Sequence, residues 1–269
     1  HNEAVHGVTI YNGFVDQKIT ATSNPFDWLE ASFFYMNIPD NVLCRRGLDG
    51  KIFCQGYKDK GFNLKVKLKD EGILPAISMG INDIAGTGYY GSEYVVASYG
   101  LNKLDLHFGL GWGNYNGSEN ELQNPLKYLS SRFESRSNAS PTDQGGTFNA
   151  GRYFSGKSVS PFYGLSYSVN EKIILKFEKD TTLTPGKIEH DIAKSDYSFG
   201  VSYSINETLN LGISSERGNG ISFNFQYKKD PNSSFKKSQY KYKKSDDNVE
   251  ADKYDKLIAN LENNGIGVS

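Results

Sequence analysis

Apolar and polar residues alternate along several segments of this chain. In the clearest one, residues 104–112, Leu, Phe and Trp stand at every second position and are separated by Asp105, His107 and two glycines. Residues 197–205 and 220–228 repeat the pattern. Successive side chains of a strand point to opposite faces, so a period of two predicts β-strands with one apolar and one polar face. Such a polar face excludes a second dry core. A closed barrel in an outer membrane, with lipid outside and a wet lumen inside, satisfies both faces.

The pattern therefore predicts an all-β fold, an antiparallel transmembrane β-barrel of about 12 strands with a short helical segment near the C-terminus. Closely spaced strands joined by glycine- or asparagine-containing turns favour antiparallel hairpins. The expected strands are residues 27–37, 61–69, 76–82, 93–99, 104–112, 147–154, 160–169, 172–179, 197–205, 208–216 and 220–228. Two long polar stretches, 114–146 and 180–195, are typical of external loops, and residues 122–133 predict a short helix within the first.

Changes in composition divide the chain into four parts. Residues 1–23 are expected to form an irregular N-terminal segment, or one short strand, that could plug or line the lumen. Residues 24–229 are the expected outer-membrane β-barrel. Residues 230–245 are basic and contain tyrosines, which we interpret as a solvated linker at the membrane surface rather than a nucleic-acid site. Residues 246–269 predict an amphipathic helix and the start of a truncated α/β domain.

Composition changes this picture little. A net charge of -1 over 269 residues does not point to nucleic acid. No apolar run approaches the roughly 18 residues that a transmembrane helix requires, so a helical membrane protein is excluded. Aromatic residues make up 13% of the chain, which fits interfacial girdles but is also common in soluble sandwiches. The chain begins at His1 without a Met or an apolar leader, which predicts a mature chain or an excised fragment.

The two cysteines, Cys44 and Cys54, flank a turn-like stretch at residues 45–50. In an oxidising compartment such a pair closes a small hairpin loop and stabilises it by roughly 2 to 3 kcal/mol. We therefore expect a disulfide. Two unpaired thiols are the alternative, whereas a metal site would need two further ligands that the neighbouring sequence lacks.

Charged residues on the polar faces are the candidate lumen residues. A Lys or Arg at mid-height of a lipid-facing surface costs about 2 to 4 kcal/mol, so these side chains are expected to point inward. The candidates are Lys65, Lys67, Asp105, His107, Lys176 and Glu178. Arg217 is assigned to a turn with Gly218 and Asn219. Two interpretations of the inward face stay open: salt bridges that close the lumen, or a path that offers hydrogen bonds to sugar hydroxyls.

No enzyme constellation is evident in the sequence. The histidines are His1, His6, His107 and His190. Their spacing matches no metal site, and the chain has neither a Gly-x-Ser-x-Gly elbow nor a phosphate loop. Glycoside cleavage needs two carboxylates at a defined separation. The sequence does not give the separations between Glu30, Asp83 and Glu93. We therefore expect a non-enzymatic protein without catalytic residues, cofactor or metal.

A set of short segments occurs in a fixed order between residues 24 and 228. They are 25–33 (PFDWLEASF), 57–65 (YKDKGFNLK), 74–83 (LPAISMGIND), 86–88 (GTG), 92–98 (SEYVVAS), 109–113 (GLGWG), 161–164 (PFYG) and 216–219 (ERGN). Together they resemble the YjbH-like family of Gram-negative exopolysaccharide and capsule biosynthesis proteins. The resemblance implies an outer-membrane β-barrel protein, usually several hundred residues long with further barrel and periplasmic domains. This chain is much shorter and lacks the C-terminal part of the family, and the resemblance implies no catalytic residue.

These observations predict a non-enzymatic β-barrel protein in the outer membrane of a Gram-negative bacterium, taking part in surface exopolysaccharide or capsule biosynthesis, export or assembly. Its expected partners are outer-membrane lipid, polysaccharide and other export or assembly proteins, and not nucleic acid. Two alternatives remain. In a soluble carbohydrate-binding β-sandwich the apolar stripe of residues 104–112 would be dry core, whereas a general diffusion porin would conduct ions without polysaccharide partners.

Overall fold

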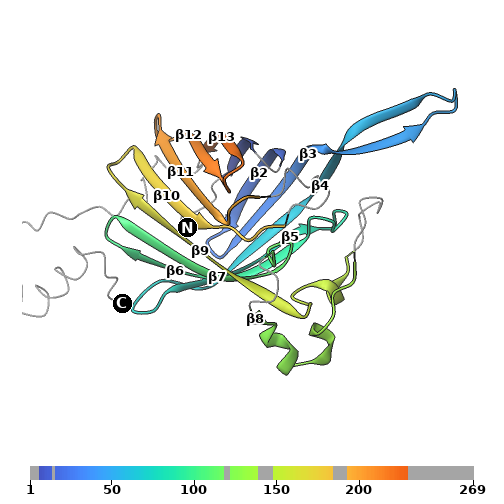
Figure 1. Cartoon of the computed structure of the whole chain (residues 1–269). Coiled ribbons are helices and arrows are strands. Elements are labelled where there is room, and N and C mark those ends of the chain that lie inside the picture. The colour runs from blue at the N-terminus through green and yellow to red at the C-terminus, as the bar shows by residue number, and fades with distance from the viewer. Residues whose placement is uncertain (1–5, 14–15, 118–121, 139–147, 184–192, 230–269) are drawn as a thin grey trace, which may run out of the picture.

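One antiparallel sheet closes on itself to form a barrel (Figure 1). The computed structural model describes residues 6–13, 16–117, 122–138, 148–183 and 193–229. Within these ranges twelve strands form the wall, and the two-residue β8 adds to β9 beyond the ladder that β9 forms with β7. The predicted twelve-stranded antiparallel barrel is confirmed.

The wall strands follow one another around the barrel almost in chain order. They are β1 (His6–Asn12), β2 (Gln17–Phe26), β3 (Leu29–Arg46), β4 (Ile52–Lys69), β5 (Ala76–Ile84), β6 (Ser92–Leu101), β7 (Leu104–Gly113), β9 (Ser158–Ser168), β10 (Ile173–Lys179), β11 (Tyr197–Ser204), β12 (Leu209–Glu216) and β13 (Gly220–Lys229). Between β7 and β9 lie β8 (Leu122–Gln123) and three short 3-10 helices: η1 (Pro125–Tyr128), η2 (Ser131–Phe133) and η3 (Ala150–Arg152).

The two ends of the barrel differ in the length of their connections. At one end, which we call the turn end, the strands are joined by residues 27–28, 70–75, 102–103, 169–172 and 205–208. At the opposite end, the loop end, the connections include 85–91, 114–157 and 180–196. The β3–β4 hairpin projects far beyond the barrel at the loop end (Figure 1). The first and last described strands meet at the turn end, where His6 pairs with Lys229.

The described part of residues 1–23 is not irregular but forms strands, the alternative that the sequence left open, with two strands in place of one. Residues 6–12 form β1 and residues 17–26 form β2. β1 pairs with β2 on one side and with β13 on the other, so it closes the barrel. The sequence signal is weak because a short strand carries few apolar residues. Pro25 lies at the irregular end of the β2–β3 ladder.

Two further expectations need correction between β7 and β9. The described part of the strand expected at 147–154 contains η3 in its place, and the helix expected at 122–133 is divided into β8, η1 and η2. The linker expected at 230–245 and the helical part expected at 246–269 lie outside the described residues. The β-sandwich alternative is wrong, because the apolar stripes do not meet across two stacked sheets but stand exposed on one closed sheet.

The closing role of β1 can be tested with Ile10→Pro. Ile10 pairs with both Phe225 and Ile19, and proline removes the N–H that one of these ladders uses. We expect a lower temperature for the shift from the folded to the unfolded band in semi-native electrophoresis. Ile10→Val keeps the N–H and most of the side chain and should behave like the unchanged chain. Equal stability of the two variants would contradict closure through β1.

Candidate functional site

The strand registers place all six predicted lumen residues on one face of the sheet. Residues that pair directly across two strands share a face. The relevant pairings are Lys65↔Gly80, Gly80↔Tyr94, Tyr94↔Gly111, Lys67↔Ser78, Asp105↔Ser166, Ser166↔Lys176, His107↔Gly164 and Gly164↔Glu178. Since strand residues two apart also share a face, these pairings join into one continuous inner surface.

The opposite face carries large apolar side chains that stand exposed. Phe108, Phe199 and Ile221 are 55%, 60% and 62% exposed, although they belong to paired strands in the middle of the sheet. Outward tyrosines near the turn end form a belt: Tyr99, Tyr167, Tyr203 and Tyr227. An exposed apolar band with an aromatic belt is the outer surface expected of a barrel that contacts lipid.

A cavity of about 410 Å³ lies inside the barrel close to the loop end. Its lining combines aromatic rings, amide and hydroxyl groups, and carboxylates. These residues include Asn82, Tyr94, His107, Tyr115, Phe162, Glu178, Asp180 and Thr181. Ligand sites are often found in the mouths of β-barrels, and flat rings next to hydrogen-bonding groups suit a hydroxylated ligand better than an apolar one.

The lumen aromatic residues are accommodated by glycines on neighbouring strands. A Cβ atom on Gly109 would lie 2.2 Å from Cζ of Phe162, and one on Gly80 would lie 2.3 Å from Cζ of Tyr94. The ring centroids of Tyr94 and Phe162 are 6.4 Å apart. Each glycine thus leaves the space into which a ring folds flat against the wall.

Tyr115 enters the lumen from the connection that follows β7. Gly113 has a φ of +62°, which turns the chain inward, and the Tyr115 ring lies 5.9 Å from that of Tyr94. Asn82 Nδ2 donates to the Tyr115 hydroxyl at 2.9 Å, and Thr181 Oγ1 donates to the Tyr115 carbonyl at 2.7 Å. Burial raises the pKa of the Tyr115 hydroxyl, which keeps it neutral. Tyr115 therefore narrows the lumen and ties two loops together.

The six predicted lumen residues do not gather at one place. His107 and Glu178 line the cavity, and His107 Nδ1 lies 2.8 Å from Ser98 Oγ. Lys65 pairs with Glu30 across the β3–β4 ladder, nearer the turn end. Lys67 Nζ lies 2.5 Å from a carboxylate oxygen of Asp70 in the next turn.

Asp105 and Lys176 share the inner face but do not line the cavity. Asp105 lies two residues from His107 on β7, and Lys176 lies two residues from Glu178 on β10. Some charges pair locally, while others line open space.

Arg217 lies in the β12–β13 turn, as assigned from the sequence, with a φ of +48°. It is 7% exposed, and its guanidinium donates to the carbonyls of Ser195 and Thr182. Its Nη2 lies 4.0 Å from a carboxylate oxygen of Asp196. Arg217 therefore fixes the connection between β10 and β11 against the barrel rim.

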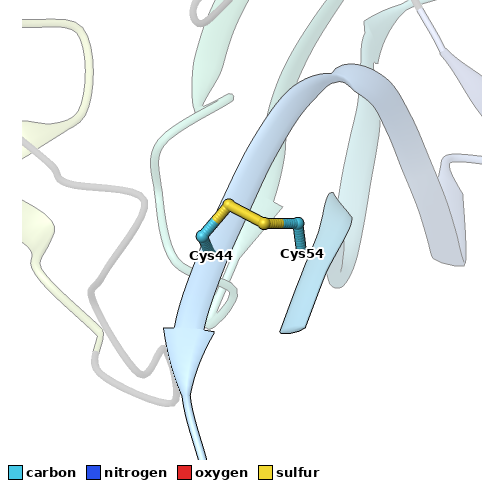
Figure 2. The surroundings of a disulfide bond; sticks show 2 residues. All are labelled: Cys44 and Cys54. Atoms are coloured by element: carbon cyan, nitrogen blue, oxygen red, sulfur yellow. A yellow bond between two sulfur atoms is a disulfide. The ribbon is translucent and has the colours of Figure 1, made fainter. Parts of the chain in front are cut away.

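Cys44 and Cys54 form a disulfide between directly paired residues of β3 and β4, with Cα atoms 4.0 Å apart (Figure 2). The bond joins the two strands in the part of the hairpin that projects beyond the wall (Figures 1 and 2). An isolated two-stranded ribbon is marginally stable, so a covalent link is most useful there.

The residues that shape the cavity most were not among those predicted from the sequence. Tyr94, Tyr115 and Phe162 point inward, whereas aromatic residues had been expected mainly on the outer face. The available signal was the run of glycines at polar positions of β5 and β7, because a missing side chain on an inner wall leaves room for a neighbouring ring.

The described part of the chain shows no group of three or more His, Cys, Asp or Glu residues arranged to hold a metal ion. Within the same ranges, no helix is both long and apolar enough to cross a bilayer.

Comparison with known proteins identifies the family. The family model described as "Exopolysaccharide biosynthesis protein YbjH" matches residues 8–267. The chain belongs to the YjbH exopolysaccharide biosynthesis family. It is 33% identical over 212 residues to the "Uncharacterized lipoprotein YjbH" of Escherichia coli (strain K12). That alignment covers 76% of this chain but only 29% of the relative, so the chain corresponds to less than a third of the longer protein.

Two solved structures match most of this chain at low sequence identity. The NanC porin matches with 9% identity and a TM-score of 0.37 over 84% of this chain and 97% of the porin. The outer membrane phospholipase A of Escherichia coli matches with 8% identity and a TM-score of 0.33 over 84% of this chain and 89% of the phospholipase.

The pairing of glycine with ring can be tested with Gly109→Ala. The added methyl group would overlap the Phe162 ring, and overpacking of this kind typically costs about 1 to 3 kcal/mol. We expect a lower urea midpoint of unfolding. The double variant with Phe162→Ala should recover part of the loss, because the ring that clashes is gone. Gly220→Ala is the control, since a Cβ there meets no atom within 4 Å. Equal destabilisation at both glycines would contradict the pairing.

Proposed function

We propose that this chain is a non-enzymatic β-barrel of the bacterial outer membrane that acts in the export or assembly of surface exopolysaccharide. The observation that carries the proposal is the division of one closed sheet into an exposed apolar outer face and a polar inner face. Only surroundings that are apolar outside and hydrated inside suit both faces. Membership of the exopolysaccharide family supports a role connected with polysaccharide.

The proposed orientation places the loop end outside the cell and the turn end in the periplasm. Outer-membrane barrels have short periplasmic turns and long external loops. The turn end also holds the start of β1 and the end of β13. Strands β6, β7 and β13 each contain 10 residues, which agrees with the roughly 9 to 11 residues that a tilted crossing strand needs.

A passive role agrees with the positions of two of the three carboxylates considered for glycoside cleavage, Glu93 and Asp83. Glu93 is fully buried and is held by both terminal nitrogens of Arg136. Asp83 is 4% exposed on β5. Such side chains are not placed to reach a polymer in the lumen. In the proposed role the lumen cavity contacts sugar through rings, amides and hydroxyls without breaking bonds.

Insertion and orientation can be tested by labelling single cysteines in intact cells. Leu48 lies at the tip of the projecting hairpin, and Lys103 lies in a turn at the opposite end. The two native cysteines form a disulfide, so an engineered cysteine is the reactive thiol. We expect a bulky maleimide-polyethylene glycol to label Leu48→Cys on intact cells and Lys103→Cys only after the outer membrane is opened. Labelling of both on intact cells, or of neither, would contradict the proposed orientation.

Passage through the lumen can be tested with Gly164→Trp. Gly164 lines the cavity. A Cβ there would lie 3.2 Å from the Phe177 carbonyl oxygen, a tight contact that a shift of a few tenths of an ångström relieves, and the ring beyond it would occupy the cavity. We expect cells carrying this variant to secrete much less exopolysaccharide.

Leu165→Trp is the matched control. Leu165 is the next residue on β9 and pairs with Leu106, so its side chain points outward. Secretion should then stay near normal. Normal secretion by Gly164→Trp, with the barrel folded and present in normal amounts, would show that polysaccharide does not pass through this lumen.

A further inference from the structure

Part of the connection between β7 and β9 folds against the outside of the barrel. We call its described residues, 122–138 and 148–157, the outer-wall excursion. Glu93, Trp112 and Val159 occupy one outward-facing row across β6, β7 and β9, yet they are 0%, 2% and 0% exposed. Outward apolar residues elsewhere on the wall, such as Phe108 and Leu110, are exposed or partly exposed, so the excursion covers this row.

Hydrogen bonds hold the excursion in this position. Arg136 Nη1 and Nη2 donate to the two carboxylate oxygens of Glu93 at 2.6 and 2.9 Å. The indole nitrogen of Trp112 donates to Asn124 Oδ1 at 3.0 Å. Asn124 Nδ2 in turn donates to the Phe133 carbonyl at 3.0 Å. These bonds hold the excursion against the row of the wall that contains Glu93 and Trp112.

The covered row lies where the exposed apolar band of the outer wall ends. Along β7, Phe108 is 55% exposed, whereas Trp112 is covered. At about 3.3 Å per residue, these two positions are about 13 Å apart along the strand. In an inserted barrel the excursion therefore begins where the hydrocarbon layer gives way to headgroups, and it faces lipid rather than the lumen.

The surface of the excursion suits this boundary. Tyr128 and Leu129 are 78% and 77% exposed. Next to them lies a hollow of about 610 Å³. Its lining provides the ammonium groups of Lys127 and Lys157, the hydroxyl of Ser135 and the amide of Gln123. Ser158 also lines it, but its hydroxyl already accepts from Asn116 Nδ2. One carboxylate, that of Glu134, opposes them.

Lysine, hydroxyl and amide groups together are typical ligands of phosphate. Lys127 Nζ also lies 5.0 Å from the centroid of the Tyr128 ring and contacts the Gln123 side chain, which brings the cationic and apolar parts together. A tyrosine beside a lysine is a common anchor at a membrane interface.

We propose that the outer-wall excursion binds the anionic phosphate headgroup of an outer-leaflet lipid. Lys127 and Lys157 contact the phosphate, while Tyr128 and Leu129 enter the upper part of the apolar layer. This inference rests on the proposed insertion of the barrel into a membrane. It adds a lipid partner on the outer wall, separate from the lumen.

The depth of the excursion can be measured with fluorophores on single cysteines. The variants are Leu129→Cys on the excursion, Phe199→Cys on the wall and Leu48→Cys at the hairpin tip. In vesicles of phosphatidylcholine and phosphatidylglycerol that contain a doxyl-labelled quencher lipid, we expect quenching at positions 129 and 199 but not at 48. Quenching at 199 without quenching at 129 would overturn this inference and leave the insertion intact. Absence of quenching at both would overturn the insertion, and this inference with it.

The charge requirement is tested with the double variant Lys127→Gln and Lys157→Gln. Each lysine near an anionic membrane surface is worth about 1 kcal/mol, so we expect roughly thirty-fold weaker binding of lipid A to the detergent-solubilised barrel. Lys103→Gln with Lys172→Gln removes the same charge from exposed turns at the opposite end and should leave binding unchanged.

Semi-native electrophoresis confirms that both double variants are folded before binding is compared. Equal binding by the two would overturn the proposal. Competition by inorganic phosphate at the concentration at which lipid A binds would show a site for free phosphate, which also overturns a lipid site.

Discussion

The structure depends on the pairing of β1 with β13. Without this pairing, a sheet of twelve strands has two edges with unpaired N–H and C=O groups. Lipid cannot form hydrogen bonds with these groups, and pairing with another chain at an open edge leads to aggregation. The register His6↔Lys229 to Asn12↔Phe223 joins those edges. Closure also creates an inside and an outside, and only then do alternating polar and apolar residues become two different environments.

Glycines, which lack a side chain, shape the inner surface as much as the large side chains do. Glycines on β5 and β7 give up their side-chain space to Tyr94 and Phe162, and Gly113 turns the chain so that Tyr115 joins them. The cavity is lined by these rings together with Glu178 and His107. A ring packed over a glycine has little freedom to change rotamer, so the rings form a rigid surface.

The two ends of the barrel are built for different surroundings. The turn end has short connections, while the loop end carries the disulfide-linked hairpin and the outer-wall excursion. The Glu93–Arg136 pair is buried between the wall and the excursion. A buried ion pair of this kind is costly to leave half-formed, so it fixes the position of the excursion on the wall. The proposed lumen path and the proposed lipid contact therefore occupy opposite faces of the same strands.

The alternation of apolar and polar residues was enough to predict the strand class, the barrel and the side to which most residues point. The reason is local: a period of two assigns Leu106 and His107 to opposite faces wherever the strand lies. The sequence also marked Cys44 and Cys54 as a pair across a short turn. Tertiary structure alone decided that residues 6–12 close the barrel, because that pairing joins segments more than two hundred residues apart. It likewise decided that Tyr115 lies inside and that Glu93 lies beneath the excursion, since loops without periodicity take their place from long-range contacts that no local pattern encodes.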